Sequence, residues 1–140
     1  MTLTAANFSH RYRVRIFWED TDAGGVVYYA NYLKFLERCR TEWLRALGVD
    51  QRLLRLQRRL QFAVVHVAVE FLRPALLDDE VVVTAELDRL GGATISFKQA
   101  IWRDEVQLIE ASTRVACLDA GSLKPRAIPK DLFAEWRRGQ

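Results

Sequence analysis

The period of the hydrophobic pattern changes along the first part of the chain, and each change predicts an element. Polar and apolar residues roughly alternate from His10 to Trp18, which is typical of a strand, and Glu19–Gly25 has the Asp and Gly content of a loop. From Asn31 to Leu47 the apolar residues recur at helical spacing. We expect the buried face of that helix to consist of Tyr32, Phe35, Leu36, Cys39, Trp43, Ala46 and Leu47. Asp50–Leu60 predicts a shorter, Arg-rich helix with Asp50 near its cap.

Four further strands are predicted in the second half of the sequence. Their expected ranges are Phe62–Phe71, Glu80–Leu90, Ala93–Trp102 and Val106–Leu118. Gly91 and Gly92 suit a hairpin turn with positive φ, and the short turns between the strands predict an antiparallel meander. The sheet needs an apolar cover, and only the long helix can provide one. The pattern therefore predicts a single α+β domain over residues 1–140, with a sheet wrapped around a central helix.

Composition narrows the class of protein. Half of the 140 residues are hydrophobic and 28% are charged, which is typical of a globular domain. No apolar run approaches the roughly 18 residues of a transmembrane helix, and the first residues contain no apolar core of a secretory signal. Cys39 and Cys117 lie in apolar patterns without the spacing of zinc ligands. We therefore expect a cytoplasmic protein with reduced, buried thiols and no metal.

The kind of positive charge is more informative than its sum. The formal net charge is +3, and 17 of the 21 basic residues are Arg. The planar guanidinium suits phosphate groups, so nucleotides, coenzyme A and nucleic acid are candidate ligands. A solvated surface is the simpler interpretation for most of these residues. Because aromatic residues are not interleaved with the basic ones, we do not expect nucleic-acid binding.

The junction between the first strand and the long helix carries the candidate chemistry. Glu19, Asp20 and Asp22 are followed by Gly24 and Gly25, shortly before the predicted helix. The first N–H groups of a helix lack intrahelical partners and carry partial positive charge. Such groups stabilise an oxyanion that forms on a carbonyl, and a nearby carboxylate can attack that carbonyl or activate water. The arrangement suits acyl transfer, and hydrolysis in particular.

Other interpretations of this loop stay open on these residues alone. An Asp that precedes a helix is more often a cap or a turn former. The Asp-Thr-Asp motif lacks the regular oxygen spacing of a calcium loop, and Gly24-Gly25 is too short for a phosphate-binding loop. Hydrolysis is therefore one candidate function among several at this point.

A longer segment around the loop resembles a known family. Arg15–Leu44, RIFWEDTDAGGVVYYANYLKFLERCRTEWL, resembles 4-hydroxybenzoyl-CoA thioesterase-like proteins of the hotdog fold, and within them the acyl-CoA thioesterases associated with the bacterial Tol–Pal system. The similarity continues through Val69–Val81 and Leu123–Leu132. It implies a curved five-stranded antiparallel sheet around a long central helix. The implied activity is hydrolysis of an acyl-CoA thioester to a free acid and the CoA thiol.

The resemblance also implies roles for residues of the loop. Asp22 matches the family's catalytic Asp, acting as nucleophile or as general base, and the Tyr29 backbone N–H matches its oxyanion donor. Many members of the Tol–Pal branch have His where this chain has Tyr29, and a backbone donor survives that change. Gly25 would let the backbone approach the substrate closely. Val26, Val27 and Tyr28 would pack near the acyl chain or in the core, and the core is the better interpretation.

Residues elsewhere are weaker candidates for substrate binding. Thr94 and Ser96 could hydrogen-bond the pantetheine arm, and possible phosphate partners are Arg59, Arg73, Arg89 and Arg126, among which spacing does not select. Another hotdog branch places its catalytic Glu on the central helix, but Glu37 falls on the polar face here. We expect His66, alone in a Val-rich strand, to be a packed or interface residue, and no Ser lies in a nucleophile elbow.

Expected partners follow from the same resemblance. Hotdog proteins generally pair their sheets edge to edge, which implies a homodimer or a homotetramer, and acyl carrier protein is a possible partner. We expect no metal or redox cofactor. Coenzyme A would enter the site as part of the substrate. One alternative is a weakly catalytic interaction module that binds acyl carrier protein, cell-envelope or lipid-synthesis partners. A hotdog hydratase is disfavoured because neither His lies in the EDTDAGG loop.

Overall fold

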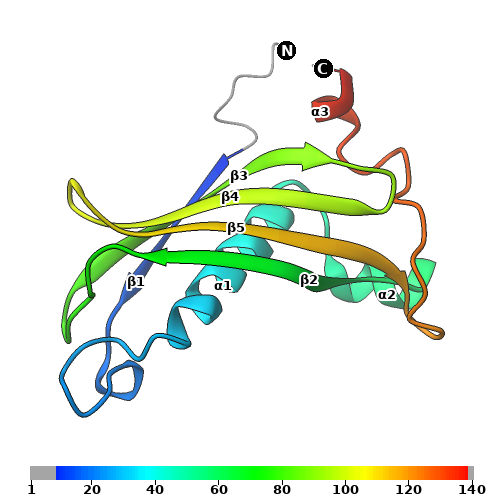
Figure 1. Cartoon of the computed structure of the whole chain (residues 1–140). Helices are drawn as coiled ribbons and strands as arrows, with labels where there is room; N and C mark the ends of the chain where they lie inside the picture. The colour runs from blue at the N-terminus through cyan, green and yellow to red at the C-terminus, as the bar shows by residue number, and fades with distance from the viewer. Residues whose placement is uncertain (1–8, 139–140) are drawn as a thin grey trace.

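Figure 1 shows one curved sheet with a long helix running beneath it. The structure, a computed structural model, describes residues 9–138. Its strands are β1 (Ser9–Arg15), β2 (Leu60–Phe71), β3 (Glu80–Leu90), β4 (Thr94–Arg103) and β5 (Val106–Asp119). Its helices are the 3-10 turn η2 (Trp18–Asp20), α1 (Asn31–Ala46), α2 (Gln51–Arg58) and α3 (Ala134–Arg138). The predicted α+β architecture, with a five-stranded antiparallel sheet around a long helix, is confirmed.

The strand order corrects one prediction. The sheet runs β1-β3-β4-β5-β2, so β3, β4 and β5 form a meander, but β2 pairs with β5 instead of β3. The predicted four-strand meander is therefore wrong. The connection 72–79 spans up to about 26 Å when extended, while three strand spacings measure about 14 Å. It is therefore long enough to cross β5 and β4, and it leaves β2 at an edge of the sheet.

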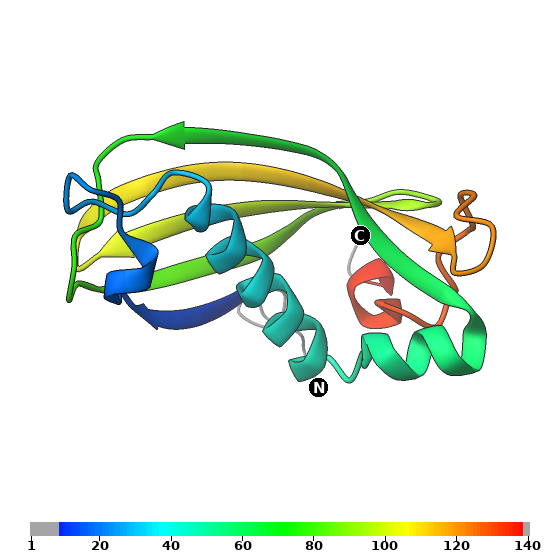
Figure 2. The same cartoon turned by 90° about the horizontal axis from the view of Figure 1, so that it is seen from below.

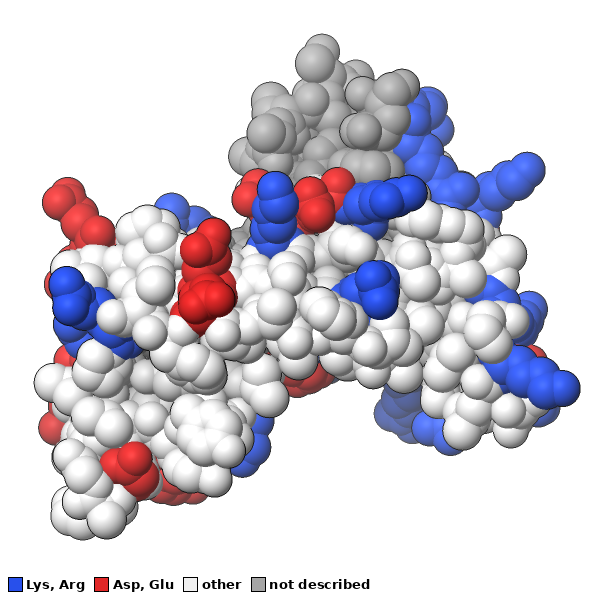
Figure 3. Space-filling view, in the orientation of Figure 1, with Lys and Arg blue, Asp and Glu red and all other residues white. Residues whose placement is uncertain are grey.

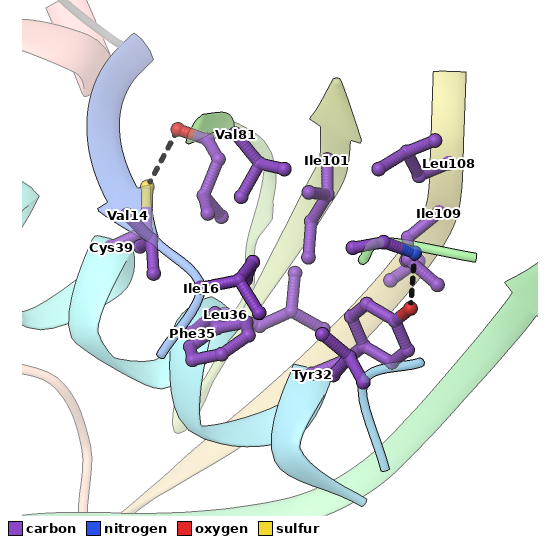
Figure 4. Close-up of a cluster of buried hydrophobic side chains, with 14 of the residues drawn as sticks. Val14, Ile16, Tyr32, Phe35, Leu36, Cys39, Val81, Ile101, Leu108 and Ile109 are labelled. Carbon is purple, nitrogen blue, oxygen red and sulfur yellow. Dashed lines mark hydrogen bonds between the residues drawn. The ribbon is translucent and has the colours of Figure 1, made fainter. Parts of the chain in front are cut away.

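Helix α1 packs lengthwise against the inner face of the sheet (Figure 2). Its buried side chains are Tyr32, Phe35, Leu36, Cys39, Arg40, Trp43 and Leu44. Figure 4 shows the cluster that several of these side chains form with Val14 and Ile16 and with β3, β4 and β5. The prediction was wrong for Ala46 and Leu47, which are exposed, because the helix ends beyond the part that the sheet covers.

The ends of several elements also differ from the predicted ones. Strand β1 ends at Arg15, since Trp18 already belongs to the 3-10 turn. Asp50 caps α2 as predicted, because its carboxylate accepts the Arg52 and Leu53 N–H groups at 2.9 and 3.1 Å. Positive φ at Gly91 and Gly92 was predicted wrongly, since neither glycine adopts it. That turn is closed by a hydrogen bond from the Gly91 N–H to the Thr94 carbonyl at 2.8 Å.

The sequence contains no apolar run as long as a transmembrane helix. Within residues 9–138, no helix combines the length and the apolar character needed to cross a bilayer.

Candidate active site

A small hairpin, residues 20–28, leads into the first turn of α1. Thr21 and Val27 form an antiparallel bridge. The Asp22 N–H donates to the Val26 carbonyl at 2.8 Å, and the Tyr28 N–H donates to the Asp20 carbonyl at 3.0 Å. These bonds hold the acidic strand of the hairpin against the segment that starts the helix. The loop predicted from Asp and Gly content is therefore an ordered turn that places its acidic residues beside the helix N-terminus.

The three acidic residues of this hairpin have different surroundings. The Asp20 carboxylate accepts the Phe17 N–H at 2.8 Å, which closes the 3-10 turn. Glu19 is exposed. The Asp22 carboxylate is also exposed, and one of its oxygens accepts the Gly24 N–H at 2.8 Å. Its other oxygen has no partner among residues 9–138, so Asp22 is the acid whose carboxylate is oriented and still available.

The glycines of the turn fit this role. A Cβ added at Gly24 would lie 3.2 Å from Asp22 Oδ1, so a side chain there would crowd the carboxylate. Gly25 has φ +80°, a conformation that L side chains rarely adopt. Val26, a candidate for contact with the acyl chain, is half-buried and bridges to Leu76, while Val27 lies in the core. Tyr28, for which the core was the better interpretation, is exposed instead.

Tyr29 presents its backbone at the start of the helix. Within the described residues its N–H donates to no acceptor, and its side chain is 63% exposed. The ring lies 5.0 Å from that of Tyr28 and 6.2 Å, edge to face, from that of Phe71 at the end of β2. The free N–H therefore belongs to a residue whose ring packs with those of Tyr28 and Phe71, on the segment that follows the Asp22 turn.

Tyr32, in the first turn of α1, is buried in the core. Its buried hydroxyl accepts the Ala75 N–H at 3.0 Å (Figure 4). Burial raises the pKa of Tyr32; the Ala75 amide and the Arg103 charge lower it, and the Asp22 and Asp79 charges raise it. At ordinary pH Tyr32 is therefore a neutral group that fixes this end of α1.

The inner face of β2 extends the same site as an apolar strip. Val64, Val67 and Phe71 point to this face and are 50%, 39% and 53% exposed. They remain uncovered because α1 packs against β1 and β3, which lie toward the opposite edge of the sheet from β2. The site thus opens onto an unfilled apolar surface that ends at the free edge of the sheet.

Other predicted binding residues lie away from Asp22 in this chain. Arg89 and Ser96 face each other near the β3–β4 turn, close to Thr94. Figure 1 shows that turn at the opposite end of the sheet from the hairpin. Arg126 donates to the Arg58 carbonyl at 3.2 Å and lies 3.5 Å from Asp119. The structure does not bring these residues together with Asp22 within one chain, and their substrate contacts stay predictions.

The remaining candidates have local surroundings. Arg59 ends α2 with φ 55°, and Arg73 follows the end of β2 and is exposed. His66 is exposed on the outer face of β2, opposite Arg114. Glu37 lies on the exposed face of α1, as predicted, and accepts the Thr41 hydroxyl at 2.7 Å. Within residues 9–138, no group of three or more His, Cys, Asp or Glu could hold a metal ion.

Sequence reasoning missed one buried polar network beneath α1. Arg40 is 8% exposed and donates to Gln99 Oε1 at 2.9 Å, while Gln99 Nε2 donates to the Leu36 carbonyl at 3.0 Å. Burial lowers the pKa of Arg40, and the Glu37 charge raises it. The one signal in the sequence was Gln99, a polar residue at an inward position of an alternating strand.

Comparisons with known proteins identify the family of this chain. The thioesterase superfamily matches residues 24–110. The acyl-CoA thioesterase YbgC of Haemophilus influenzae is 46% identical over 121 residues, which cover 86% of this chain and 89% of that protein. The acyl-CoA thioester hydrolase YbgC of Escherichia coli O157:H7 is 43% identical over 129 residues, which cover 91% and 96%.

Solved structures give the same result for the fold. The "Probable Thioesterase from Bartonella henselae" superposes with a TM-score of 0.82 at 36% identity, covering 86% of this chain and 99% of that one. A hypothetical protein of Thermus thermophilus gives a TM-score of 0.83 at 27% identity, covering 89% and 95%. The resemblance found in the sequence is thereby confirmed. This chain belongs to the thioesterase superfamily and is a thioester hydrolase with the hotdog fold.

Proposed function

We propose that the protein hydrolyses acyl-CoA thioesters to a free acid and CoA, with Asp22 as nucleophile or general base and the Tyr29 N–H as oxyanion donor. The observation that carries this proposal is an available carboxylate on the hairpin that leads into the helix, together with a Tyr29 amide at the helix start that has no acceptor within residues 9–138. The names of the relatives from Haemophilus influenzae and Escherichia coli support acyl-CoA as the substrate class. The family match begins at residue 24, so the role of Asp22 depends on the geometry and on the resemblance.

The geometry suggests how the reaction would proceed. The thioester carbonyl oxygen accepts the Tyr29 N–H, which stabilises the negative charge that develops there. Asp22 either attacks the carbonyl carbon, giving an acyl-enzyme that water then hydrolyses, or takes a proton from water that attacks directly. In both routes the C–S bond breaks, the CoA thiolate takes a proton, and the acid is released. The residues supply this chemistry without a metal or redox cofactor.

The walls of the site would hold the substrate in place. Gly25 keeps the turn open because no side chain stands there, and Val26 lies beside it. Tyr29 and Phe71 form an aromatic wall that leads to the apolar strip on the inner face of β2. That strip would accept the acyl group, since burying apolar surface is favourable.

The proposal includes a homodimer formed through β2. This strand is an edge of the sheet and exposes Val64, Val65 and Val67. An exposed apolar edge strand offers unpaired backbone groups to another chain, and a second copy of β2 would cover both the edge and the strip. Pairing of dimers into a tetramer, contact with acyl carrier protein and a cytoplasmic location stay predictions.

The test is thiol release from a panel of acyl-CoAs by the wild type and by Asp22→Asn. The panel runs from short and long aliphatic chains to benzoyl and phenylacetyl groups. Because charge is lost at nearly constant shape, we expect the rate to fall about 100-fold or more, with fold and oligomer unchanged. Glu19→Gln is the matched control, since Glu19 is an exposed acid of the same loop.

An unchanged rate in Asp22→Asn would overturn the assignment of Asp22. If the wild type releases no thiol from any acyl-CoA, the acyl-CoA hydrolase proposal fails. The remaining hypotheses are then an acyl-carrier substrate and the interaction module. A pull-down with acyl carrier protein beside the turnover assay separates those two.

A further inference from the structure

The connection between β2 and β3 lies against the hairpin that holds Asp22. The Val27 N–H donates to the Ala75 carbonyl at 2.9 Å, and Val26 and Leu76 form an antiparallel bridge. The Asp22 N–H in turn donates to the Val26 carbonyl at 2.8 Å. Two successive residues of the hairpin are therefore paired with the connection, and one of them is bonded directly to the residue that is proposed to react.

The first turn of α1 binds the same connection. Ala75 is fully buried, and its N–H donates to the Tyr32 hydroxyl at 3.0 Å (Figure 4). Ala75 thus joins the helix that begins beside the Tyr29 amide to the hairpin that carries Asp22. Because a buried amide without an acceptor is costly, loss of the Tyr32 hydroxyl would weaken this junction while leaving every group of the proposed reaction in place.

An ion pair at the end of β4 holds the rest of the connection. Asp79 Oδ2 accepts the Leu76 N–H at 2.9 Å and an Arg103 guanidinium N–H at 2.8 Å. The same Arg103 nitrogen donates to the Pro74 carbonyl at 3.2 Å. Arg103 therefore joins the two ends of the turn that contains Ala75, and Asp79 fixes the residue of that turn that bridges to the hairpin.

Charges of both signs meet at this end of the molecule (Figure 3). Arg13 and Arg15 pair with Glu80, and these side chains are 79%, 51% and 41% exposed. The side chains of Arg103 and Asp79 are only 30% and 20% exposed. Exposed ion pairs contribute little, because water and salt screen them. The Arg103–Asp79 pair is therefore the less screened of these described pairs, and its bonds reach the connection that carries Ala75.

We propose that Tyr32, Arg103 and Asp79 are positioning residues for the reaction, which fix the hairpin through the connection between β2 and β3 and so keep the Asp22 carboxylate in its reactive place. This inference rests on the proposed function. The polar atoms of the three side chains bind the backbone of the connection or each other. Since a displacement of about 1 Å can lower a rate about 100-fold, loosening the connection should lower kcat without removing a reacting group.

The first test is hydrolysis of the preferred acyl-CoA by Tyr32→Phe and by Arg103→Gln. We expect kcat to fall about 10-fold or more in each variant and KM to change less than about two-fold, because the reacting group is displaced while the walls of the site stay. Arg58→Gln is the control, since Arg58 forms an ion pair with Asp131 at 2.8 Å on α2, at the other end of the molecule. Its kcat should not change.

The second test separates positioning from a general loss of structure. The same substitutions are made in the Asp22→Asn protein, and its residual rate is measured. A residue that acts through Asp22 has nothing left to position there, so we expect no further fall in the residual rate. A general loosening of the fold would lower the rate by the same factor in both backgrounds, and that result would overturn the proposal.

Hydrogen exchange provides a measurement that does not depend on activity. In Tyr32→Phe and Arg103→Gln, the amides of Val27 and Leu76 should exchange at least about 10-fold faster, while those of α2 keep their rates. Arg103 is only half-buried, so Arg103→Gln maintains the test if the buried substitution Tyr32→Phe prevents folding. Unchanged exchange at Val27 in a folded variant would contradict the proposed hold on the hairpin.

The two proposals fail in different ways. A large fall in kcat for Asp22→Asn, with unchanged kcat in Tyr32→Phe and Arg103→Gln, would overturn the positioning role alone. Full activity of Asp22→Asn would overturn the role of Asp22 and the positioning role together.

Discussion

At the scale of single residues, hydrogen-bond partners decide which acid of the hairpin is available for chemistry. Asp20 has its carboxylate committed to the Phe17 N–H and its carbonyl to the Tyr28 N–H and the Asn31 side chain. It therefore holds the hairpin in shape. Asp22 accepts one amide, and its other oxygen has no partner in the part of the chain that the structure describes, so the same turn that orients this carboxylate leaves it able to react.

The two cysteines allow a prediction from their pKa values. Burial raises the pKa of Cys39 to about 12, although the Arg40 charge lowers it, and burial also raises that of Cys117. Both thiols are buried and therefore protonated near neutral pH. We expect neither thiol to react with a disulfide reagent at pH 8 in the native protein, and both to react in denaturant. Rapid labelling of the native protein would contradict this expectation.

The same shift has a consequence for stability. The unfolded chain releases the Cys39 proton near the ordinary pKa of about 8.5, whereas the folded chain holds it until about pH 12. Above the lower value the unfolded state binds fewer protons, so stability falls as pH rises. The contribution of this thiol is fully present below about pH 8.5 and is lost through about pH 12. Denaturant midpoints measured from pH 7 to pH 10 should therefore decrease.

Residue-scale prediction from sequence succeeded where a residue follows the pattern of its element. Cys39 lies on the apolar face of its helix and is buried as expected. Arg40 was missed because a periodic pattern assigns a cation to the solvent. Its burial depends on Gln99, which is 59 residues away in the sequence and satisfies the guanidinium inside the fold. Such a pairing across the fold cannot be inferred from local spacing.

At the scale of elements, α2 is the helix whose formation depends most on its cap. It has eight residues, too short for a stable isolated helix, and Leu54 is its buried side chain. The Asp50 carboxylate satisfies two of its first amides. Asp50→Ala should therefore destabilise the protein by about 1 kcal/mol and lower Tm by roughly 3–5 °C. Asp50→Asn is the control, because Asn also caps helices; an equal loss in both variants would refute the capping argument.

Strand identity and strand order differ in how far sequence predicts them. The alternation along β3, β4 and β5 gave their ranges to within one residue at each end, because each strand has one buried and one exposed face. The place of β2 was predicted wrongly, since alternation does not say which neighbour a strand pairs with. Val64, Val65 and Val67 in β2 are exposed. The proposed second subunit would cover this run of apolar residues.

At the scale of the whole molecule, the two ends of the sheet have different chemistry. The hairpin that holds Asp22 lies at one end and α2, which exposes Arg52 and Arg55, at the other, with the length of β2 between them. The exposed edge of β2 is the element through which the proposed second subunit would cover the apolar strip.

The substitution Val67→Asp tests this assembly directly. Val67 lies near the middle of β2 and is 39% exposed, so two-fold pairing places the two copies close together. Two carboxylates opposite each other on paired strands repel, and their burial without partners is costly. We expect the wild type to sediment as a dimer or tetramer and Val67→Asp as a monomer at micromolar concentration, with kcat/KM for acyl-CoA reduced at least 10-fold. Val106→Asp is the control, since Val106 is 44% exposed but lies on β5. A monomeric wild type, or a Val67→Asp protein that stays associated, would rule out the β2 interface.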